Sequence, residues 1–133
     1  MKKILILDAN SIINRAFYGI RTLNAPDGTP TNAIYGFLNI LMKLITEHKP
    51  DCILAAFDLK APTFRHKIYS EYKANRHGMP DELAVQMPIT KDILSQMNIP
   101  ILQLEGYEAD DIIGTVSRMC EEKSMQCFIA TGD

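Results

Sequence analysis

The sequence predicts an α/β fold in which a mostly parallel β-sheet is covered by helices on both faces. Three short apolar runs, at 4–7, 53–57 and 128–132, each lead directly into an aspartate. Apolar runs of this length between turn residues are typical of buried parallel strands. Segments with helical spacing separate the runs, and connections of a dozen or more residues join parallel strands. We therefore expect a three-layer sandwich in one domain of 133 residues, whose 47% hydrophobic content allows a real core.

Turn and capping residues define the elements of the first half. Asn10 or Ser11 is a candidate N-cap, and so is Thr31 or Asn32, because short polar side chains accept hydrogen bonds from the first amides of a helix. Two prolines and an Asp-Gly pair between these helices predict a loop with a turn. In order, we predict a strand over 3–8, a helix to about Leu23, a loop over 24–31, a helix to about His48 and a strand over 52–57.

The second half begins with an irregular segment, 59–80, which is rich in basic and aromatic residues. Asp81 is the candidate N-cap of a helix that extends to about Met97, and Pro88 kinks this helix or divides it in two. A last helix begins at an acidic motif, and its apolar residues keep helical spacing. The remaining elements are a strand over 99–104, a helix from Glu108 to about Lys123 that buries Ile112, Ile113, Val116 and Met119 or Cys120, and a strand over 126–130.

Acidic residues recur where the predicted strands end. In an open parallel sheet the carboxyl ends of the strands form the ligand-binding edge, so these side chains converge there. Like charges so close together repel unless a cation lies among them, and oxygen ligands suit magnesium or manganese. For any one aspartate, capping of the next helix is the competing explanation, and for the acidic motif it is the helix dipole. The candidate metal ligands are Asp8, Asp58, Glu108, Asp110, Asp111 and Asp133.

The overall net charge of −2 hides a basic segment. Between residues 60 and 77 there are five Lys or Arg and one Glu, a net charge of +4, so the rest of the chain carries −6. Cations neutralise phosphates and aromatic rings stack on bases, which predicts a clamp on a nucleic-acid strand; a solvated basic loop is the alternative. Arg15 lies on the first helix, where it reaches a phosphate or remains an ordinary surface arginine. The candidate DNA-binding residues are Arg15, Lys60, Arg65, Lys67, Tyr72, Lys73 and Arg76.

Several other classes of protein are excluded. No apolar stretch is long enough to span a membrane, and the chain enters its first strand at once, so we expect neither a membrane protein nor a signal peptide. The three cysteines are odd in number and widely spaced, as in a cytosolic protein with reduced thiols. Neither they nor the three histidines have the spacing of a zinc site. Four aromatic residues are expected in the core or at its margin, namely Phe17, Tyr18, Tyr35 and Phe37.

Several sequence blocks resemble the N-terminal 5′-nuclease domain of bacterial DNA polymerase I, which belongs to the flap endonuclease family. They are Leu-Asp-Ala-Asn-Ser near the start, Tyr-Gly-Phe at 35–37, Phe-Asp-x-Lys-Ala-Pro-x-Phe-Arg-His at 57–66, Tyr-Lys-Ala-Asn-Arg at 72–76 and Gly-Tyr-Glu-Ala-Asp-Asp at 106–111. The resemblance extends in order along the whole chain. It implies a PIN-like, resolvase-like fold and metal-dependent hydrolysis of DNA or RNA from a 5′ end or at a 5′ flap.

The resemblance also implies roles for particular residues. Asp8, Asp58, Glu108, Asp110 and Asp111 match the family's ligands for a first ion, and Asp133 matches a ligand for the second. Arg65, Lys73 and Arg76 match a basic arch that grips the 5′ strand, with Lys73 and Arg76 stabilising the phosphoryl oxygens as catalytic residues. The implied mechanism is two-metal hydrolysis with Mg²⁺ or Mn²⁺.

The chain also departs from the family pattern. Ala9 replaces a usual glycine, and Asn14 replaces a tyrosine that many members carry near the scissile base. The chain ends on an aspartate that closes a predicted strand, so we expect a C-terminally truncated domain with weak or no activity by itself. Its expected partners are DNA with a 5′ end or flap, an RNA primer and the rest of DNA polymerase I. Two alternatives remain open: a stand-alone PIN-type ribonuclease, and a non-catalytic DNA-binding module with a structural ion.

Overall fold

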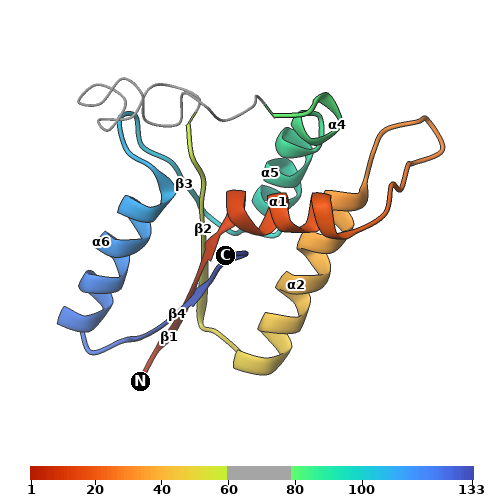
Figure 1. Cartoon of the computed structure of the whole chain (residues 1–133). Helices are drawn as coiled ribbons and strands as arrows, with labels where there is room; N and C mark the ends of the chain where they lie inside the picture. Colours follow the sequence, from red (N-terminus) through yellow and green to blue (C-terminus); the bar gives the residue numbers. More distant parts are fainter. Residues whose placement is uncertain (60–78) are drawn as a thin grey trace.

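The computed structural model describes residues 1–59 and 79–133. It confirms the predicted three-layer α/β architecture (Figure 1). A four-stranded parallel sheet in the order β3-β2-β1-β4 forms the middle layer. One face packs against helices α1, α2, α4 and α5 through a large apolar core that includes Leu5, Phe37 and Leu94. The other face packs against α6 through a smaller cluster that includes Ile6 and Ile113.

The strands lie close to where the sequence predicts them. β1 spans Lys3–Asp8, β2 spans Cys52–Ala56 and β4 spans Gln126–Ala130. The third strand was expected over 99–104, but β3 covers only Ile101–Leu102. It lies at the edge of the sheet, where Pro100 has no amide to donate and can only accept the hydrogen bond from the Ala55 amide.

Helix α1, Ala9–Gly19, is shorter at its end than predicted. The side-chain amide of Asn32 donates to the carbonyls of Phe17 (2.9 Å) and Ile20 (3.1 Å), so a residue of the next helix caps this terminus. The helix also begins one or two residues before the predicted N-caps, and Asp8 precedes it without a side-chain capping bond. The expectation that Asn10 or Ser11 caps this helix was therefore wrong, because both side chains contact other segments.

Helix α2, Asn32–His48, has the predicted bounds, but its cap comes from far away in the sequence. Thr31 occupies the N-cap position without a side-chain hydrogen bond. Instead, the fully buried Gln86 accepts hydrogen bonds from the amides of Ala33 (2.8 Å) and Ile34 (3.0 Å). Its own amide donates to Asn32 Oδ1 at 2.9 Å. A buried polar side chain thus supplies the acceptor that the first amides of α2 require.

The predicted helix after Asp81 is divided in two, as one reading of Pro88 anticipated. The pieces are α4, Asp81–Ala84, and α5, Gln86–Gln96. The break lies at Val85, and Pro88 is in the first turn of α5, where its missing amide costs no hydrogen bond. The last helix, α6, spans Ala109–Glu122. In the part of the chain that the structure describes, no helix has both the length and the apolar character of a membrane span.

Candidate functional site

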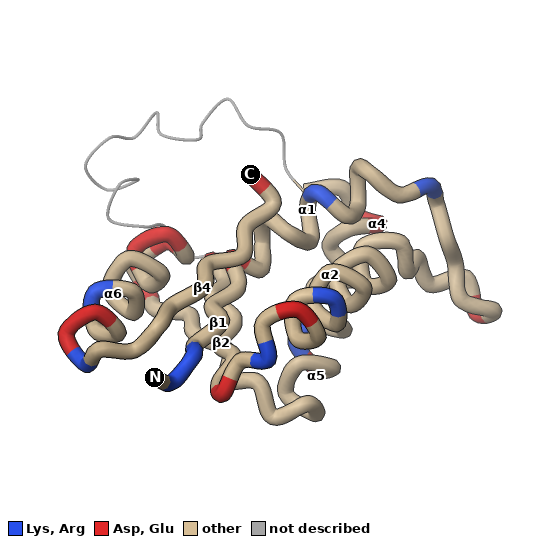
Figure 2. The backbone as a smooth tube through the Cα atoms, turned by 90° about the horizontal axis from the view of Figure 1, so that it is seen from below, with Lys and Arg blue, Asp and Glu red and all other residues tan. Residues whose placement is uncertain are grey.

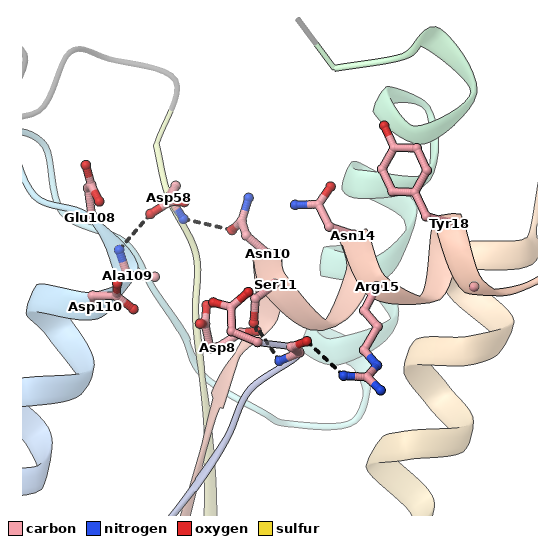
Figure 3. A pocket seen from close by; sticks show the side chains of 13 residues that line it. Asp8, Asn10, Ser11, Asn14, Arg15, Tyr18, Asp58, Glu108, Ala109 and Asp110 are labelled. Carbon is pink, nitrogen blue, oxygen red and sulfur yellow. Dashed lines mark hydrogen bonds between the residues drawn. The ribbon is translucent and has the colours of Figure 1, made fainter. Parts of the chain in front are cut away.

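A pocket of about 630 Å³ lies where the strands end, and five carboxylates line it. Figure 3 shows its side chains, which come from the ends of β1, β2 and β4, from the length of α1 and from the start of α6. Figure 2 marks the acidic residues along the backbone, among them those at the C-terminus of the chain and on α6. The five carboxylates are those of Asp8, Asp58, Glu108, Asp110 and Asp133.

Sheet topology explains why three of these residues meet. β1 pairs in parallel with β2 on one side and with β4 on the other. Asp8 is the last residue of β1, and Asp58 and Asp133 follow β2 and β4 by two and three residues. Parallel neighbours end at the same edge, so three aspartates that are 50 or more residues apart in sequence reach one pocket. This confirms that the strand-terminal aspartates converge.

The start of α6 contributes the other two carboxylates. Asp58 Oδ1 accepts a 2.7 Å hydrogen bond from the amide of Ala109, the first residue of this helix. The amide of Asp58 in turn donates to Asn10 Oδ1 at 2.9 Å. Asp58 therefore joins the starts of α1 and α6, and it holds Glu108 and Asp110 at the pocket.

The pKa of Asp110 is raised by its surroundings in the pocket. Burial is the largest factor that raises the pKa of Asp110, and the charges of Asp8, Asp58, Glu108 and Asp133 raise this pKa further. All four are residues of the same pocket. Like charges favour the neutral form of a carboxyl group, so repulsion from these four neighbours adds to the effect of burial on Asp110. A cation bound among them would remove the repulsion.

The donor set fits a hard divalent cation. The candidate ligands are all carboxylates, and within the described residues no salt bridge neutralises Asp8, Asp58, Asp110 or Asp133. No three His, Cys, Asp or Glu side chains of residues 1–59 and 79–133 are already close enough together to hold one ion. Mg²⁺ is commonly bound by one or two carboxylates together with several waters, so a pocket of separated carboxylates suits it.

The structure does not bring Asp111 to the other five carboxylates. Its Oδ2 accepts a hydrogen bond from the amide of Glu108 at 2.9 Å, as part of a capping box at the start of α6. Asp111 instead lines a separate hollow beside Tyr107 and Ile112. Helical spacing suggested that Glu108 and Asp111 share a face, but Glu108 precedes the helix with an extended backbone, φ −93° and ψ 165°, so that spacing does not apply to it.

Helix α1 provides one side of the pocket. Asn10, Asn14 and Tyr18 follow one another at intervals of four residues, and all three line the pocket (Figure 3). Tyr18 is 71% exposed. The ring of the partly buried Phe17 packs against it edge-on, with 5.0 Å between the two ring centroids. Arg15 also lines the pocket, and its Nη1 donates to the carbonyl of Gly132 at 3.1 Å.

Sequence reasoning found some of these residues and missed others. Phe37 is buried as expected, whereas Tyr18 and Tyr35 are exposed rather than core residues. The structure adds Asn10, Ser11 and Asn14 to the pocket. The helical spacing of 10, 14 and 18 directly after the acidic strand end was the signal that could have found this face of α1.

The predicted basic arch lies outside the described residues. Its assignments as DNA-binding or catalytic groups therefore stay predictions, as does the extent of the segment over about 59–80. The residues concerned are Lys60, Arg65, Lys67, Tyr72, Lys73 and Arg76.

Curated relatives cover the whole chain. The chain is 46% identical over 131 residues to DNA polymerase I of Caldicellulosiruptor bescii, which is 98% of this chain and 15% of that polymerase. It is 43% identical over 133 residues to a 5′-3′ exonuclease of Aquifex aeolicus, which is all of this chain and 46% of that protein. The chain thus spans less than half of the length of either relative.

Solved structures agree on the fold. The chain superposes on the T5 D15 protein co-crystallised with metal ions with a TM-score of 0.71 at 17% identity, covering 99% of this chain and 49% of that one. The bacteriophage T5 D15 flap endonuclease, in a pseudo-enzyme-product complex with DNA and metal ions, gives a TM-score of 0.71 at 18% identity over the same shares. This likeness confirms the predicted PIN-like architecture. Residues 3–133 match the family described as the 5′-3′ exonuclease, N-terminal resolvase-like domain, and the chain belongs to that family.

Proposed function

We propose that this pocket is the catalytic site of a 5′-3′ exonuclease that hydrolyses phosphodiester bonds of DNA with divalent cations, Mg²⁺ or Mn²⁺. The observation that carries the proposal is the meeting of five carboxylates, four of which raise the pKa of Asp110. A protein has little reason to accept such repulsion unless a cation offsets it. Membership of the 5′-3′ exonuclease family supports the reaction and its direction.

The residues have separable roles in this proposal. Asp8, Asp58, Glu108 and Asp110 surround one ion at the ends of β1 and β2, with one or two of them bound to it directly and the others through waters. Asp133 contributes to a second ion from the end of β4. Bound divalent ions supply Lewis acidity and positive charge at the phosphate. The chain itself fixes the position of the bound ions through its carboxylates. The Ala109 amide donates a hydrogen bond to one oxygen of Asp58, and the Thr131 hydroxyl donates to one oxygen of Asp8.

The DNA strand approaches along α1. Arg15 uses one of its guanidinium hydrogens on the Gly132 carbonyl, and other donors remain for a phosphate oxygen. Of the described residues that line the pocket, Arg15 is the one Lys or Arg. Lys73 and Arg76 complete the phosphate contacts from the basic arch, with Lys60, Arg65, Lys67 and Tyr72 along it.

The substrate is DNA with a 5′ end or a 5′ flap, or an RNA primer paired to DNA. The process served is DNA replication and repair in the bacterial cytosol, with the rest of a DNA polymerase I as the partner. Support comes from the relatives, of which one is a DNA polymerase I, and from the neighbouring structure solved with DNA and metal ions.

The decisive experiment pairs metal binding with cleavage. Mn²⁺ binding is measured by calorimetry, and cleavage of a 5′-labelled flap DNA is followed in Mg²⁺ and in Mn²⁺, for the parent chain and for Asp58→Asn. Asparagine keeps an oxygen for the Ala109 amide but removes a charge from the pocket, so Mn²⁺ affinity should fall by roughly 100-fold or more, beyond the effect of losing an outer-sphere partner. Asp92→Asn is the control, because Asp92 is exposed on α5 and contacts Gln96.

The outcomes separate the competing functions. Equal Mn²⁺ affinity in parent and Asp58→Asn would reject the site. Metal binding that depends on Asp58, together with cleavage of single-stranded RNA in preference to flap DNA, would favour a PIN-type ribonuclease. DNA binding without cleavage at any metal concentration, by this chain and by the full-length protein, would favour a structural ion in a non-catalytic module.

A further inference from the structure

The segment after β4 is hydrogen-bonded to the first two turns of α1. The amide of Gly132 donates to Ser11 Oγ at 2.9 Å, and Arg15 Nη1 donates to the Gly132 carbonyl at 3.1 Å. The amide of Asp133 donates to Thr131 Oγ1 at 3.2 Å, and the Ser11 and Thr131 hydroxyls are 3.1 Å apart. Except for the bond between Asp133 and Thr131, these contacts join residues about 120 positions apart in the sequence, and we call the whole set the 11–131 clamp.

The clamp also reaches the carboxylate of Asp8. Thr131 Oγ1 donates to Asp8 Oδ2 at 3.2 Å, and Ser11 Oγ lies 3.0 Å from the Asp8 carbonyl, to which it donates. Each hydroxyl has a single proton. The proton of Thr131 is best used on the charged carboxylate, and the proton of Ser11 is used on the Asp8 carbonyl. The Thr131 hydroxyl therefore connects the carboxylate of Asp8 with the backbone amide of Asp133, and the Ser11 hydroxyl connects the Asp8 carbonyl with the Gly132 amide.

The fit between the two segments is too close for a side chain at Gly132. A Cβ built on Gly132 would lie 2.3 Å from the Ser11 carbonyl oxygen and 2.7 Å from its carbon. Both atoms belong to the backbone of α1, which cannot move aside as a flexible side chain can. Glycine at this position lets the segment approach α1 closely enough for the hydrogen bonds to form.

Neither Ser11 nor Thr131 is a metal ligand in the proposed function. Hydroxyl groups next to ligating carboxylates commonly fix the orientation of the ligand, and losing such a partner typically lowers metal affinity 10- to 100-fold. Asp8 is buried, so its side chain has few orientations to choose from, whereas Asp133 is exposed and follows the last strand. The exposed ligand is the one that most needs external support.

We propose that Ser11 and Thr131 are positioning residues: they orient the carboxylate of Asp8 and fix the backbone from which Asp133 reaches the same pocket, and so couple the two ends of the metal site. This inference rests on the proposed function, since it concerns the same carboxylates. It differs from a purely structural anchor in one measurable respect: an anchor changes the stability of the chain but not the metal affinity of the folded form.

The test uses Ser11→Ala and Thr131→Val, each with a matched control on another helix. Ser95→Ala removes an exposed serine hydroxyl from α5, and Thr46→Val removes an exposed threonine hydroxyl that bonds within α2. Mn²⁺ affinity is measured by calorimetry, and urea unfolding without metal shows that each variant is folded. We expect affinities about 10- to 100-fold weaker for the two clamp variants and within about twofold of the parent for the controls.

Thr131→Ser distinguishes loss of the hydrogen bond from loss of side-chain volume, because serine keeps the hydroxyl group and lacks the methyl group. It should restore parental Mn²⁺ affinity, and the combination of Ser11→Ala with Thr131→Val should be little weaker than either alone. Clamp variants that are folded and bind Mn²⁺ as the parent does would overturn the inference while leaving the proposed function intact. If Asp58→Asn also binds as the parent does, the proposed function itself fails, and the inference fails with it.

Discussion

Removal of one charge from the acidic pocket should stabilise the protein when no metal is present. In Asp110→Asn, a carboxylate that is repelled by four neighbours becomes a neutral amide of the same shape. A carboxyl group whose pKa is higher in the folded chain than in the unfolded chain binds its proton more tightly when folded. The charge on Asp110 therefore lowers the free energy of unfolding above the folded pKa, and this penalty disappears as the pH falls below the unfolded pKa.

The size of the effect follows from the exposure of Asp110. Asp110 is exposed as a residue, although partial desolvation of its carboxyl group is the largest cause of its raised pKa. Solvent therefore screens the repulsion, and exposed charge interactions contribute about 0.2–1 kcal/mol. Four neighbours act together, which puts the expected gain near the upper end, about 1 kcal/mol. For a chain of this length, this corresponds to a rise of roughly 3–4 °C in Tm.

The assay is thermal unfolding in EDTA at about pH 8 and about pH 3, on either side of the range in which carboxyl groups titrate. Asp110→Asn should be more stable than the parent at the higher pH and equal to it at the lower one. With Mn²⁺ at 100 times its dissociation constant the parent should gain about 2.7 kcal/mol and the variant less, so the order reverses. Asp92→Asn, on the exposed face of α5, should show neither effect.

One result would refute the reasoning. If Asp110→Asn is less stable than the parent in EDTA at the higher pH, the carboxylates do not repel one another in the folded chain. The pocket would then lack the electrostatic reason to bind a cation.

Three further predictions concern other parts of the chain. Gln86→Leu leaves two buried amides of α2 without their hydrogen-bond acceptor. The free energy of unfolding, measured in urea, should fall by about 2–4 kcal/mol. A loss below about 0.5 kcal/mol would mean that another group accepts these hydrogen bonds in place of Gln86. Tyr18→Ala should weaken binding of 5′-flap DNA by about 1–3 kcal/mol in a fluorescence titration, because its exposed ring at the pocket can stack on a base. Tyr35→Ala, the control on α2, should leave binding unchanged. Equal effects of the two substitutions would contradict a specific contact. Gly132→Ala places a Cβ against the Ser11 carbonyl and should cost about 1–3 kcal/mol of stability as well as metal affinity; an unchanged Tm would show that the segment moves away freely.

Local patterns in the sequence were sufficient for the framework. Strands 3–8 and 126–130 were predicted with their observed bounds, because a short apolar run between turn residues is a property of neighbouring residues. The bounds of α2 were predicted as observed, although Thr31 makes no capping bond, and the division of the next helix followed from Pro88. The prediction of Asp81 as an N-cap was wrong, because Pro80 occupies that position. The convergence of the strand-terminal aspartates followed as well, since parallel strands end at one edge.

The details of the site depended on contacts between distant residues. Asp111 was grouped with the metal ligands on helical spacing, but the backbone at Glu108 is extended and the carboxylate of Asp111 is used in a capping box. Ser11 was interpreted as a helix cap, whereas its hydroxyl accepts the amide of Gly132, 121 residues later. No local pattern records such a pair.

What the sequence by itself determined is therefore the order of the elements and the kind of chemistry at the edge of the sheet. Only the tertiary structure decided which polar side chains support that chemistry. Gln86 shows the physical reason: it is polar and lies in a helix, and nothing around it in the sequence indicates burial. It is buried because two amides of α2, more than 50 residues earlier, need an acceptor once α5 packs against that helix.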